Sequence, residues 1–136
     1  MGRVSGKIAL VTGGGSGLGR ATSILLAKEG AKVAVTDINE ESAIETAKMI
    51  GDAAIAIKHN VTSEADWKAA LEKTKNAFGG LNILVNNAGI GGGTDVEKTD
   101  FETWKHVHAV NLDSVFIGCK YAISYIEDTE GTGSIV

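Results

Sequence analysis

The sequence predicts an α/β fold in which a doubly wound parallel sheet has the strand order 3-2-1-4-5. Short apolar runs alternate with amphipathic segments along the 136 residues, which is the pattern of consecutive βαβ units. A glycine-rich stretch at residues 12–19 lies between the first apolar run and the first helical segment. Because a fifth apolar run begins only at Gly133, we expect the sheet to be incomplete on its C-terminal side.

Five short apolar runs predict the strands. Each lies between polar or glycine-rich turns, as expected for strands that are buried on both faces of a parallel sheet. The expected strands are residues 7–11, 32–36, 53–58, 81–85 and 133–136.

Four segments with apolar residues at helical spacing predict the helices between these strands. Asn39 is expected to cap the second helix. Ser63, three residues before Asp66, approximates a capping box for the third helix, and Thr99 has the same relation to Glu102 in the fourth. The expected helices run from the glycine-rich stretch to Gly30 and over residues 39–51, 63–79 and 99–127.

The composition, with 43% hydrophobic and 22% charged residues, predicts one soluble domain over residues 1–136. Thirteen basic residues against seventeen acidic ones, with no basic run, argue against binding to nucleic acid. No apolar stretch reaches the roughly 20 residues of a membrane span, so no membrane association is expected. The single Cys119 has no His or Cys at ligand spacing, which predicts a reducing, cytoplasmic location and no metal site. His106 and His108 are two apart on a helix and cannot share a metal.

The glycine-rich stretch is the candidate phosphate-binding element. Gly13 is expected to allow the tight turn out of the strand, Gly17 the close approach of backbone to ligand, and Gly19 the packing of helix on sheet. The spacing is G-x-x-x-G-x-G, so the assignment also depends on the strand-loop-helix context. A pyrophosphate at this helix N-terminus would face free N–H groups and the positive end of the helix dipole. The sequence therefore predicts a Rossmann-type dinucleotide site.

Asp37 ends the second strand, 24 residues after Gly13, where a Rossmann fold carries an acid for the adenosine ribose hydroxyls. An acid that caps a turn or the next helix is the alternative interpretation. A carboxylate at the ribose repels a 2′-phosphate, and neither Ser16 nor Ile38 brings a compensating cation. NAD is therefore the predicted cofactor, in preference to NADP.

Four motifs resemble those of the short-chain dehydrogenase/reductase family. They are T-G-x-x-x-G-x-G at residues 12–19, the acid Asp37, N-N-A-G at residues 86–89, and Asn111 in the long helix. Asn86 and Asn87 alone would be interpreted as turn residues, whereas the four motifs together are specific. The resemblance implies an NAD-dependent oxidoreductase that transfers a hydride between a nicotinamide cofactor and a secondary alcohol or ketone.

The resemblance also implies where the cofactor is contacted. At the adenine the family often has Asp-Val where this chain has Asn60-Val61, and an Asn side chain can both accept and donate there. The implied contacts are Gly13, Ser16 and Leu18 at the pyrophosphate, Asp37 and Ile38 at the ribose, Asn60 and Val61 at the adenine, and Asn87, Ala88, Gly89 and Val110 beside the cofactor.

Asn111 is the one catalytic residue that the resemblance implies within this chain. It lies in mid-helix on the same stripe as Trp104 and Val107, where a polar side chain needs a partner. In the family it bends the helix locally and holds a water in a proton relay to a Lys. Exposure to solvent is the alternative.

The other catalytic groups that the resemblance implies are a Ser, a Tyr and a Lys four residues after that Tyr. Neither Tyr121 nor Tyr125 is followed by Lys at that spacing, and Ser134 precedes the apolar part of the fifth strand. We therefore expect these groups to lie beyond Val136 and this chain alone to be inactive.

The leading hypothesis is the cofactor-binding half of such an enzyme, acting on a small alcohol or ketone. Residues 63–67 and 115–119 are similar to segments of hydroxysteroid and secondary-alcohol dehydrogenases. The alternative is a non-catalytic dinucleotide-binding module or partner subunit. Because family members usually associate through the long helix, the resemblance implies a homo-dimer or tetramer formed through residues 99–127.

Overall fold

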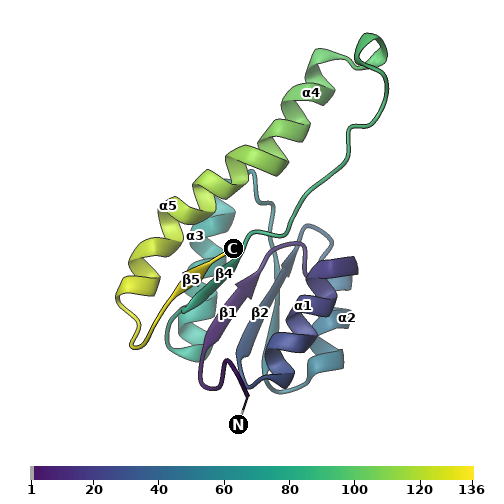
Figure 1. The fold of residues 1–136 in the computed structure, drawn as a ribbon. Coiled ribbons are helices and arrows are strands. Elements are labelled where there is room, and N and C mark those ends of the chain that lie inside the picture. Colours follow the sequence, from purple (N-terminus) through teal and green to yellow (C-terminus); the bar gives the residue numbers. More distant parts are fainter. Residues whose placement is uncertain (1) are drawn as a thin grey trace.

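The computed structural model describes residues 2–136 as a five-stranded parallel sheet with helices on both faces (Figure 1). The strand order is β3-β2-β1-β4-β5, and every neighbouring pair is parallel, so the predicted topology is confirmed. The strands are β1 (Ile8–Val11), β2 (Lys32–Asp37), β3 (Ala54–Lys58), β4 (Ile83–Val85) and β5 (Ser134–Ile135). All five predicted strands are present, and β1, β3, β4 and β5 are shorter than predicted by one or two residues.

The helices alternate with the strands along the chain. They are α1 (Gly17–Lys28), α2 (Glu40–Ile50), α3 (Glu64–Phe78), the 3-10 turn η1 (Val96–Lys98), α4 (Phe101–His108), the π-helical segment η2 (Ala109–Asp113) and α5 (Ser114–Glu127). None of the described helices is long and apolar enough to cross a membrane.

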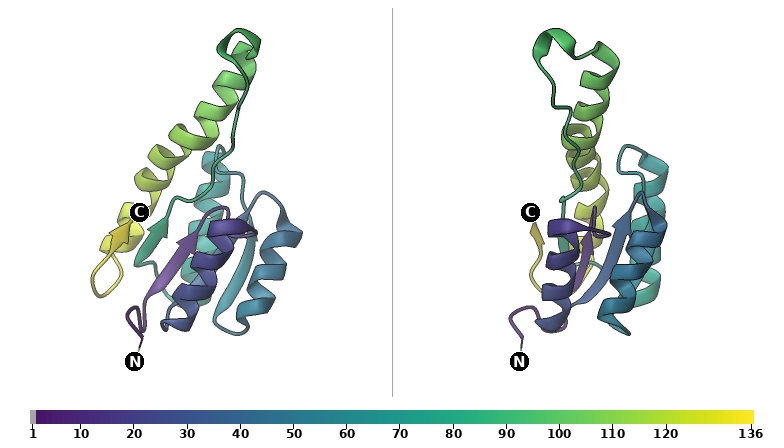
Figure 2. Two further views of the ribbon diagram at one scale, coloured as in Figure 1. Left: turned by 45° about the vertical axis from the view of Figure 1, so that its right-hand side comes forward. Right: turned by 90° about the vertical axis from the view of Figure 1, so that its right-hand side faces the viewer.

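Two apolar layers hold these helices against the sheet. On one face Val11, Val33 and Val35 pack with Ala43 of α2 and with partly buried residues of α1. On the other face lie α3 and α5 (Figure 2). The strands carry apolar side chains on both faces because both faces are covered, which explains why they are continuous apolar runs rather than alternating ones.

Two of the three predicted helix caps are present. Asn39 Oδ1 accepts a hydrogen bond of 3.0 Å from the N–H of Ser42, and Ser63 Oγ accepts one of 3.2 Å from the N–H of Asp66. The prediction for Thr99 is wrong, because Asp100 caps α4 by accepting from Thr103 N–H at 2.6 Å. The Thr99 hydroxyl instead donates to the carbonyl oxygen of Asp95, which closes η1.

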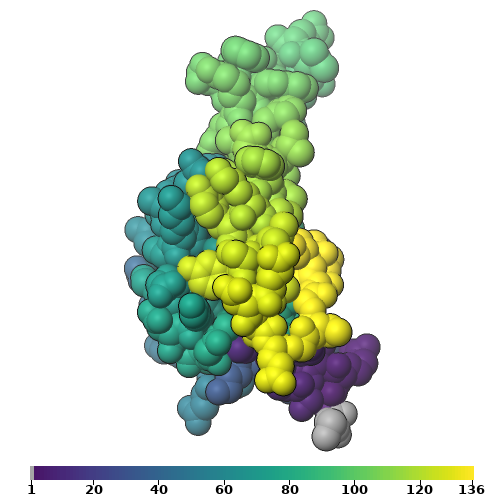
Figure 3. Space-filling model, turned by 90° about the vertical axis from the view of Figure 1, so that its left-hand side faces the viewer, coloured from purple at the N-terminus to yellow at the C-terminus, as the bar shows by residue number. Residues whose placement is uncertain are grey.

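The long helix predicted over residues 99–127 is not one regular helix. It begins at Phe101, and its hydrogen bonding changes to the π pattern over Ala109–Asp113 before α5 resumes. The α4 end and the loop before it project beyond the sheet (Figures 1 and 2), and they stand clear of the body in the space-filling view (Figure 3). Short π segments occur mostly within longer helices and often at functional sites, and this one contains Asn111.

Candidate cofactor-binding site

A cleft of about 630 Å³ lies along the carboxyl ends of β1, β2, β3 and β4. Its position follows from the topology. The chain adds β2 and β3 on one side of β1 and β4 and β5 on the other, and the connections that leave the carboxyl ends of β1 and β4 in opposite directions open a crevice between them. Every cofactor contact predicted from the sequence lines this cleft, except Gly19. The lining also includes four residues that the sequence analysis did not assign to the site, His59, Thr62, Ile90 and His106.

The loop between β1 and α1 opens the N-terminus of α1 to the cleft. Gly13 and Gly17 have φ angles of +62° and +52°, which side chains with a Cβ rarely adopt. A Cβ on Gly17 would meet no atom within 4 Å, so the space beside this backbone is free for a ligand. Ser16 precedes the helix, and its hydroxyl makes no capping hydrogen bond. Free N–H groups, the positive end of the helix dipole and this hydroxyl are the features by which helix N-termini bind anions in other proteins.

Gly19 supports the loop from below rather than lining the cleft. It is buried, and a Cβ there would meet the carbonyl oxygen of Gly13 and come within 2.6 Å of Asn87 Nδ2. The close approach of α1 to the ends of β1 and β4 therefore requires glycine, in agreement with the packing role expected from the sequence.

Asp37 stands at the rim of the cleft with both carboxylate oxygens engaged by backbone. Oδ2 accepts from Gly15 N–H at 2.9 Å, and Oδ1 accepts from Asn39 N–H at 3.0 Å. Each oxygen keeps lone-pair capacity for further donors. The carboxylate is thus held in one orientation beside the phosphate loop, where ribose hydroxyls could donate to it.

Arg20 anchors the same loop from the other side. Its guanidinium donates to the carbonyl oxygen of Gly15 at 2.6 Å and to Thr46 Oγ1 at 2.9 Å, and it pairs with Glu45 at 2.7 Å. Thr46 and Glu45 lie on α2, so this arrangement depends on tertiary packing. A single Arg on an amphipathic helix gave no signal of this role.

Thr12 and Asn87 join the ends of β1 and β4. The Thr12 hydroxyl accepts from the N–H groups of Asn87 and Ala88, both at 3.0 Å. Asn87 Nδ2 donates to the carbonyl oxygen of Thr12 at 2.9 Å. The amide nitrogen of Asn87 is therefore committed to shaping the cleft wall, and its neighbours Ala88 and Gly89 face the cleft beside it.

Asn111 clamps the glycine-rich loop after β4. Its Oδ1 accepts from Ile90 N–H and its Nδ2 donates to the carbonyl oxygen of Ile90, both at 2.8 Å. The side chain is exposed and nevertheless paired at both ends, so solvent exposure alone does not describe it. The residue expected to be catalytic thus positions the backbone of Ile90, which lines the cleft.

Asn60 lies in the wall that follows β3. Its Oδ1 accepts two hydrogen bonds from Thr62, one from N–H at 3.0 Å and one from Oγ1 at 2.7 Å. Both lone pairs of this oxygen are thus engaged within the protein, whereas Nδ2 donates to none of the described residues. The contact of Asn60 with an adenine stays a prediction.

His59 lies beside Asn60 and is only 1% exposed. Its Nδ1 lies 2.8 Å from Thr36 Oγ1, and its ring meets Trp67 edge-on with centroids 4.4 Å apart. Burial lowers the pKa of His59 to about 4, against the opposing effect of the Asp66 charge. Nε2 has no hydrogen-bond partner among the described residues. His59 directly follows the third apolar run, at the end of a strand where site residues are expected, but the sequence analysis did not assign it to the site.

Both tyrosines lie away from the cleft, on the side of α5 that packs against α3. Tyr121 donates to Glu64 Oε1 at 2.6 Å, and Tyr125 donates to Glu72 Oε2 at 2.9 Å. Burial, together with Glu72, raises the pKa of Tyr125. Neither hydroxyl is placed to act on a ligand in the cleft.

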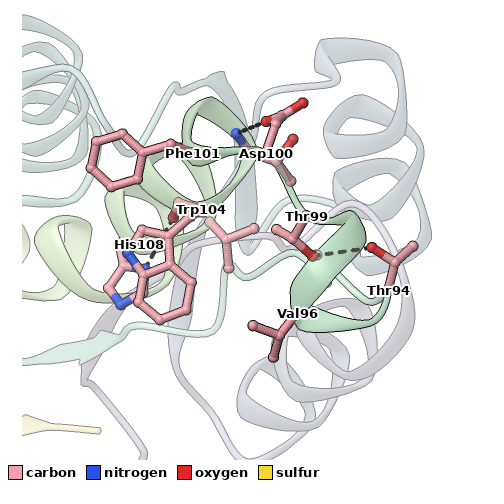
Figure 4. Close-up of a pocket in the computed structure, with 10 residues that line it drawn as sticks. Thr94, Val96, Thr99, Asp100, Phe101, Trp104 and His108 are labelled. Carbon is pink, nitrogen blue, oxygen red and sulfur yellow. Dashed lines mark hydrogen bonds between the residues drawn. The ribbon is translucent and has the colours of Figure 1, made fainter.

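A second hollow, of about 490 Å³, lies between η1 and α4 (Figure 4). The hydroxyls of Thr94 and Thr99 lie 3.1 Å apart on its loop side. On the α4 side the rings of Trp104 and His108 lie with their centroids 4.3 Å apart and their planes tilted by 37°. His108 faces this hollow whereas His106 lines the cofactor cleft, so the two histidines lie on different sides of α4, as their spacing predicted.

Comparison with known proteins is consistent with this geometry. The chain is 43% identical over 130 residues to the 3-beta-hydroxysteroid dehydrogenase of Comamonas testosteroni, covering 96% of this chain and 51% of the relative. It is 38% identical to the NADP-dependent (R)-specific alcohol dehydrogenase of Lentilactobacillus kefiri, covering 98% of this chain and 54% of the relative.

A solved structure shares the fold. The 3-ketoacyl-(acyl-carrier-protein) reductase of Brucella melitensis, complexed with NADH, matches with a TM-score of 0.88 and 39% identity, over 90% of this chain and 51% of the reductase. The chain therefore spans about half the length of the proteins it matches. The family model for short chain dehydrogenases matches residues 7–136. The chain belongs to the short-chain dehydrogenase family.

Proposed function

We propose that this chain binds NAD and forms the cofactor half of an oxidoreductase that transfers a hydride between the nicotinamide and a secondary alcohol or ketone. The observation that carries the proposal is the anchored carboxylate of Asp37, which stands beside an open helix N-terminus in one cleft. An anion site next to a fixed acid fits the pyrophosphate and ribose of a dinucleotide.

Different residues of the cleft would contact different parts of the cofactor. The α1 N-terminus and Ser16 hold the pyrophosphate, and Asp37 accepts hydrogen bonds from the ribose hydroxyls. Gly89 and Val110 line the part of the cleft next to Asn111. The nicotinamide, when bound, supplies the hydride chemistry. Asn111 keeps the backbone of Ile90 in place at that end.

Among residues 2–136 the cleft lining holds two histidines, His59 and His106, but no Tyr and no Lys, the residues that transfer a proton in this family. The two tyrosines are engaged with Glu64 and Glu72 on another face. We therefore propose that the Ser, Tyr and Lys of the family belong to a part of the protein outside these 136 residues. This chain alone is expected to bind the cofactor without turnover.

The preference for NAD is tested by titrating the purified protein with NAD and NADP in parallel. A 2′-phosphate would lie against the Asp37 carboxylate, and no Lys or Arg lines the cleft to offset the repulsion. We expect NAD to bind at least about tenfold more tightly, which corresponds to about 1.4 kcal/mol. Equal affinities would contradict the role of Asp37.

We also propose self-association through α4, η2 and α5. Leu112, Phe116 and Ile123 lie at helical spacing on this unit and are 61%, 68% and 46% exposed. An exposed apolar stripe of this kind is typical of helix–helix interfaces. A homo-dimer or tetramer would cover it.

A further inference from the structure

The cofactor cleft carries little positive charge of its own. Its lining holds one carboxylate, Asp37, and no Lys or Arg from residues 2–136. Arg20 contacts the phosphate loop from the other side, and its guanidinium is paired with Glu45 at 2.7 Å. On the basis of the proposed dinucleotide function, a pyrophosphate with two negative charges lies in this cleft against neutral N–H groups. A lining residue that can gain a positive charge would therefore act directly on the affinity for it.

The chain has three histidines, and each lies in different surroundings. His59 is 1% exposed, and burial lowers its pKa to about 4, so its ring is neutral at pH 6 and above. His108 lines the hollow between η1 and α4, where its Nδ1 lies 3.0 Å from the carbonyl oxygen of Trp104 (Figure 4). His106 is exposed and lines the cofactor cleft. Of the three, His106 is the one that can bring a changing charge into the cleft near neutral pH.

The fold explains why His106 faces the cleft. Val110 lines the cleft and packs against the core cluster that contains Val61 and Leu84. Positions four apart lie on the same face of a helix, so His106 follows Val110 one turn further along α4. At this point α4 projects beyond the sheet (Figures 1 and 2). His106 therefore stands at the mouth of the cleft, open both to a ligand and to the solvent that supplies a proton.

The ring of His106 is not engaged by the protein. It forms no hydrogen bond and no ion pair with residues 2–136, and the charges around it are largely paired with one another. The pairs are Lys105–Glu102 at 2.7 Å on α4, Lys98–Asp95 at 2.7 Å at η1, and Lys120–Glu64 at 3.7 Å between α5 and α3.

The charged groups of the cleft and of these elements that form no ion pair are Asp37, Asp66, Lys68, Glu97, Asp100 and Asp113. Carboxyl and ammonium groups as classes titrate well outside the range from pH 6 to pH 8, so they form a constant background there.

We propose that His106 binds the cofactor in its protonated form, attracted to the pyrophosphate, so that the dinucleotide takes up a proton from the solvent as it binds. The proton adds to the free ring nitrogen when the dinucleotide enters, and it returns to the solvent when the dinucleotide leaves. A nearby phosphate favours the charged imidazole, and the charged imidazole favours phosphate binding by the same factor. Because screening extends over about 8–10 Å at ordinary ionic strength, this charge acts across much of the cleft.

Calorimetric titration of the purified protein with NAD at pH 8, 7 and 6 measures the affinity at each pH. Repeating the titration at pH 7 in two phosphate-free buffers of different ionisation enthalpy gives the number of protons taken up per NAD bound. We expect the affinity to be about three- to fivefold higher at pH 6 than at pH 8, as for one exposed charge pair. Part of a proton should be taken up at pH 7. ADP-ribose, which keeps the pyrophosphate and lacks the nicotinamide ring, should show the same uptake.

Three variants assign the effect to one side chain. His106→Asn keeps a polar group that takes up no proton, so its affinity for NAD should be equal at pH 6 and pH 8. His108→Asn is the same substitution on the other side of α4, and it should keep the pH dependence of the unsubstituted protein. His106→Arg supplies a permanent cation, so it should bind NAD at pH 8 as tightly as the unsubstituted protein does at pH 6.

The outcomes distinguish the role of His106 from the function on which it rests. NAD binding that neither changes with pH nor takes up a proton would overturn this role and leave the proposed function intact. An unaltered pH dependence in His106→Asn would also overturn it, because another group would then take up the proton. If that variant does not fold, His106→Arg decides, and an affinity at pH 8 equal to that of the unsubstituted protein contradicts the proposal. Binding of neither NAD nor ADP-ribose would refute the proposed function and the role of His106 together.

Discussion

Asp37 Oδ2 accepts a hydrogen bond of 2.9 Å from the backbone N–H of Gly15, so the acid at the end of β2 also anchors the phosphate loop. The proposed ribose site and the proposed phosphate site are therefore one unit. Asp37→Asn removes the charge and puts an NH₂ group against Gly15 or Asn39. Since hydrogen bonds to charged groups contribute about 1.5–3 kcal/mol, we expect the NAD affinity to fall about ten- to a hundredfold.

Titration of this variant with NADP supplies a second readout. Its affinity for NADP should fall less than its affinity for NAD, because the substitution removes the repulsion between the Asp37 carboxylate and the 2′-phosphate as well as a hydrogen bond to the ribose. The matched control is Asp52→Asn, an exposed acid in the turn before β3. A variant at Asp37 that keeps its NAD affinity would show that the carboxylate does not meet the ribose.

Gly19→Ala tests the close packing of α1 on the ends of β1 and β4. The added Cβ would clash with the backbone of Gly13 and crowd Asn87. We expect the free energy of unfolding to drop by about 1–3 kcal/mol, as for overpacked sites, and the NAD affinity to drop with it. Gly93→Ala, where a Cβ meets nothing within 4 Å, should change neither quantity in a urea melt or a titration.

Asn111→Ala tests the clamp on Ile90. Loss of both side-chain hydrogen bonds should loosen the glycine-rich loop, while stability changes by only about 1 kcal/mol because the site is exposed. Hydrogen exchange measured by mass spectrometry should rise over residues 89–94 and stay unchanged in α2. If exchange in that loop does not rise, the clamp is not what orders it.

His59 predicts an acid-sensitive step in stability. Its pKa is lowered from 6.5 to about 4 in the folded protein. Between pH 4 and pH 6.5 this histidine is therefore protonated in the unfolded chain and neutral in the folded one. The free energy of unfolding is at its full value above pH 6.5 and falls as the pH drops toward 4. At 1.36 kcal/mol per pH unit, the loss is about 3 kcal/mol.

Urea unfolding of the protein at pH 7, 6 and 5 measures this step. His59→Phe should flatten the dependence over that range, since the carboxyl groups of Glu29, Glu64 and Asp100, whose pKa values are lowered, titrate below it. The same pH slope in the variant would assign the effect to another group.

Phe116→Glu tests association through the exposed stripe on α5. A charge at the centre of an apolar interface disfavours assembly, so sedimentation velocity should show the variant with a lower association constant than the unsubstituted protein. Ser124→Glu, an exposed position at a different angle around α5, should sediment as the unsubstituted protein does. Equal sedimentation of all three would place the interface elsewhere.

Local patterns determined most of the fold and the outline of the site. The alternation of apolar runs and helices predicts the parallel sheet, and the caps at Asn39 and Ser63 depend on residues only three positions apart. The turn between β1 and α1 needs positive φ angles at Gly13 and Gly17, and this requirement arises within a few residues of the loop itself. These features were predictable because each arises from interactions between residues that are close together in the sequence.

Contacts between distant segments were decided by the tertiary structure. Arg20 reaches α2, Asn111 reaches Ile90, and neither pairing has a signature in the sequence. The choice of Asp100 over Thr99 as helix cap shows the same limit on a smaller scale, since η1 takes the Thr99 hydroxyl first.

The sequence by itself determined that a parallel sheet presents a glycine-rich helix start and an acid at one edge, because periodicity, turns and strand ends are local properties. Only the tertiary structure decided which polar atoms at that edge form hydrogen bonds with distant residues. His59 Nδ1 lies against Thr36 of β2 and its ring meets Trp67 of α3, and this packing leaves Nε2 without a hydrogen-bond partner among residues 2–136.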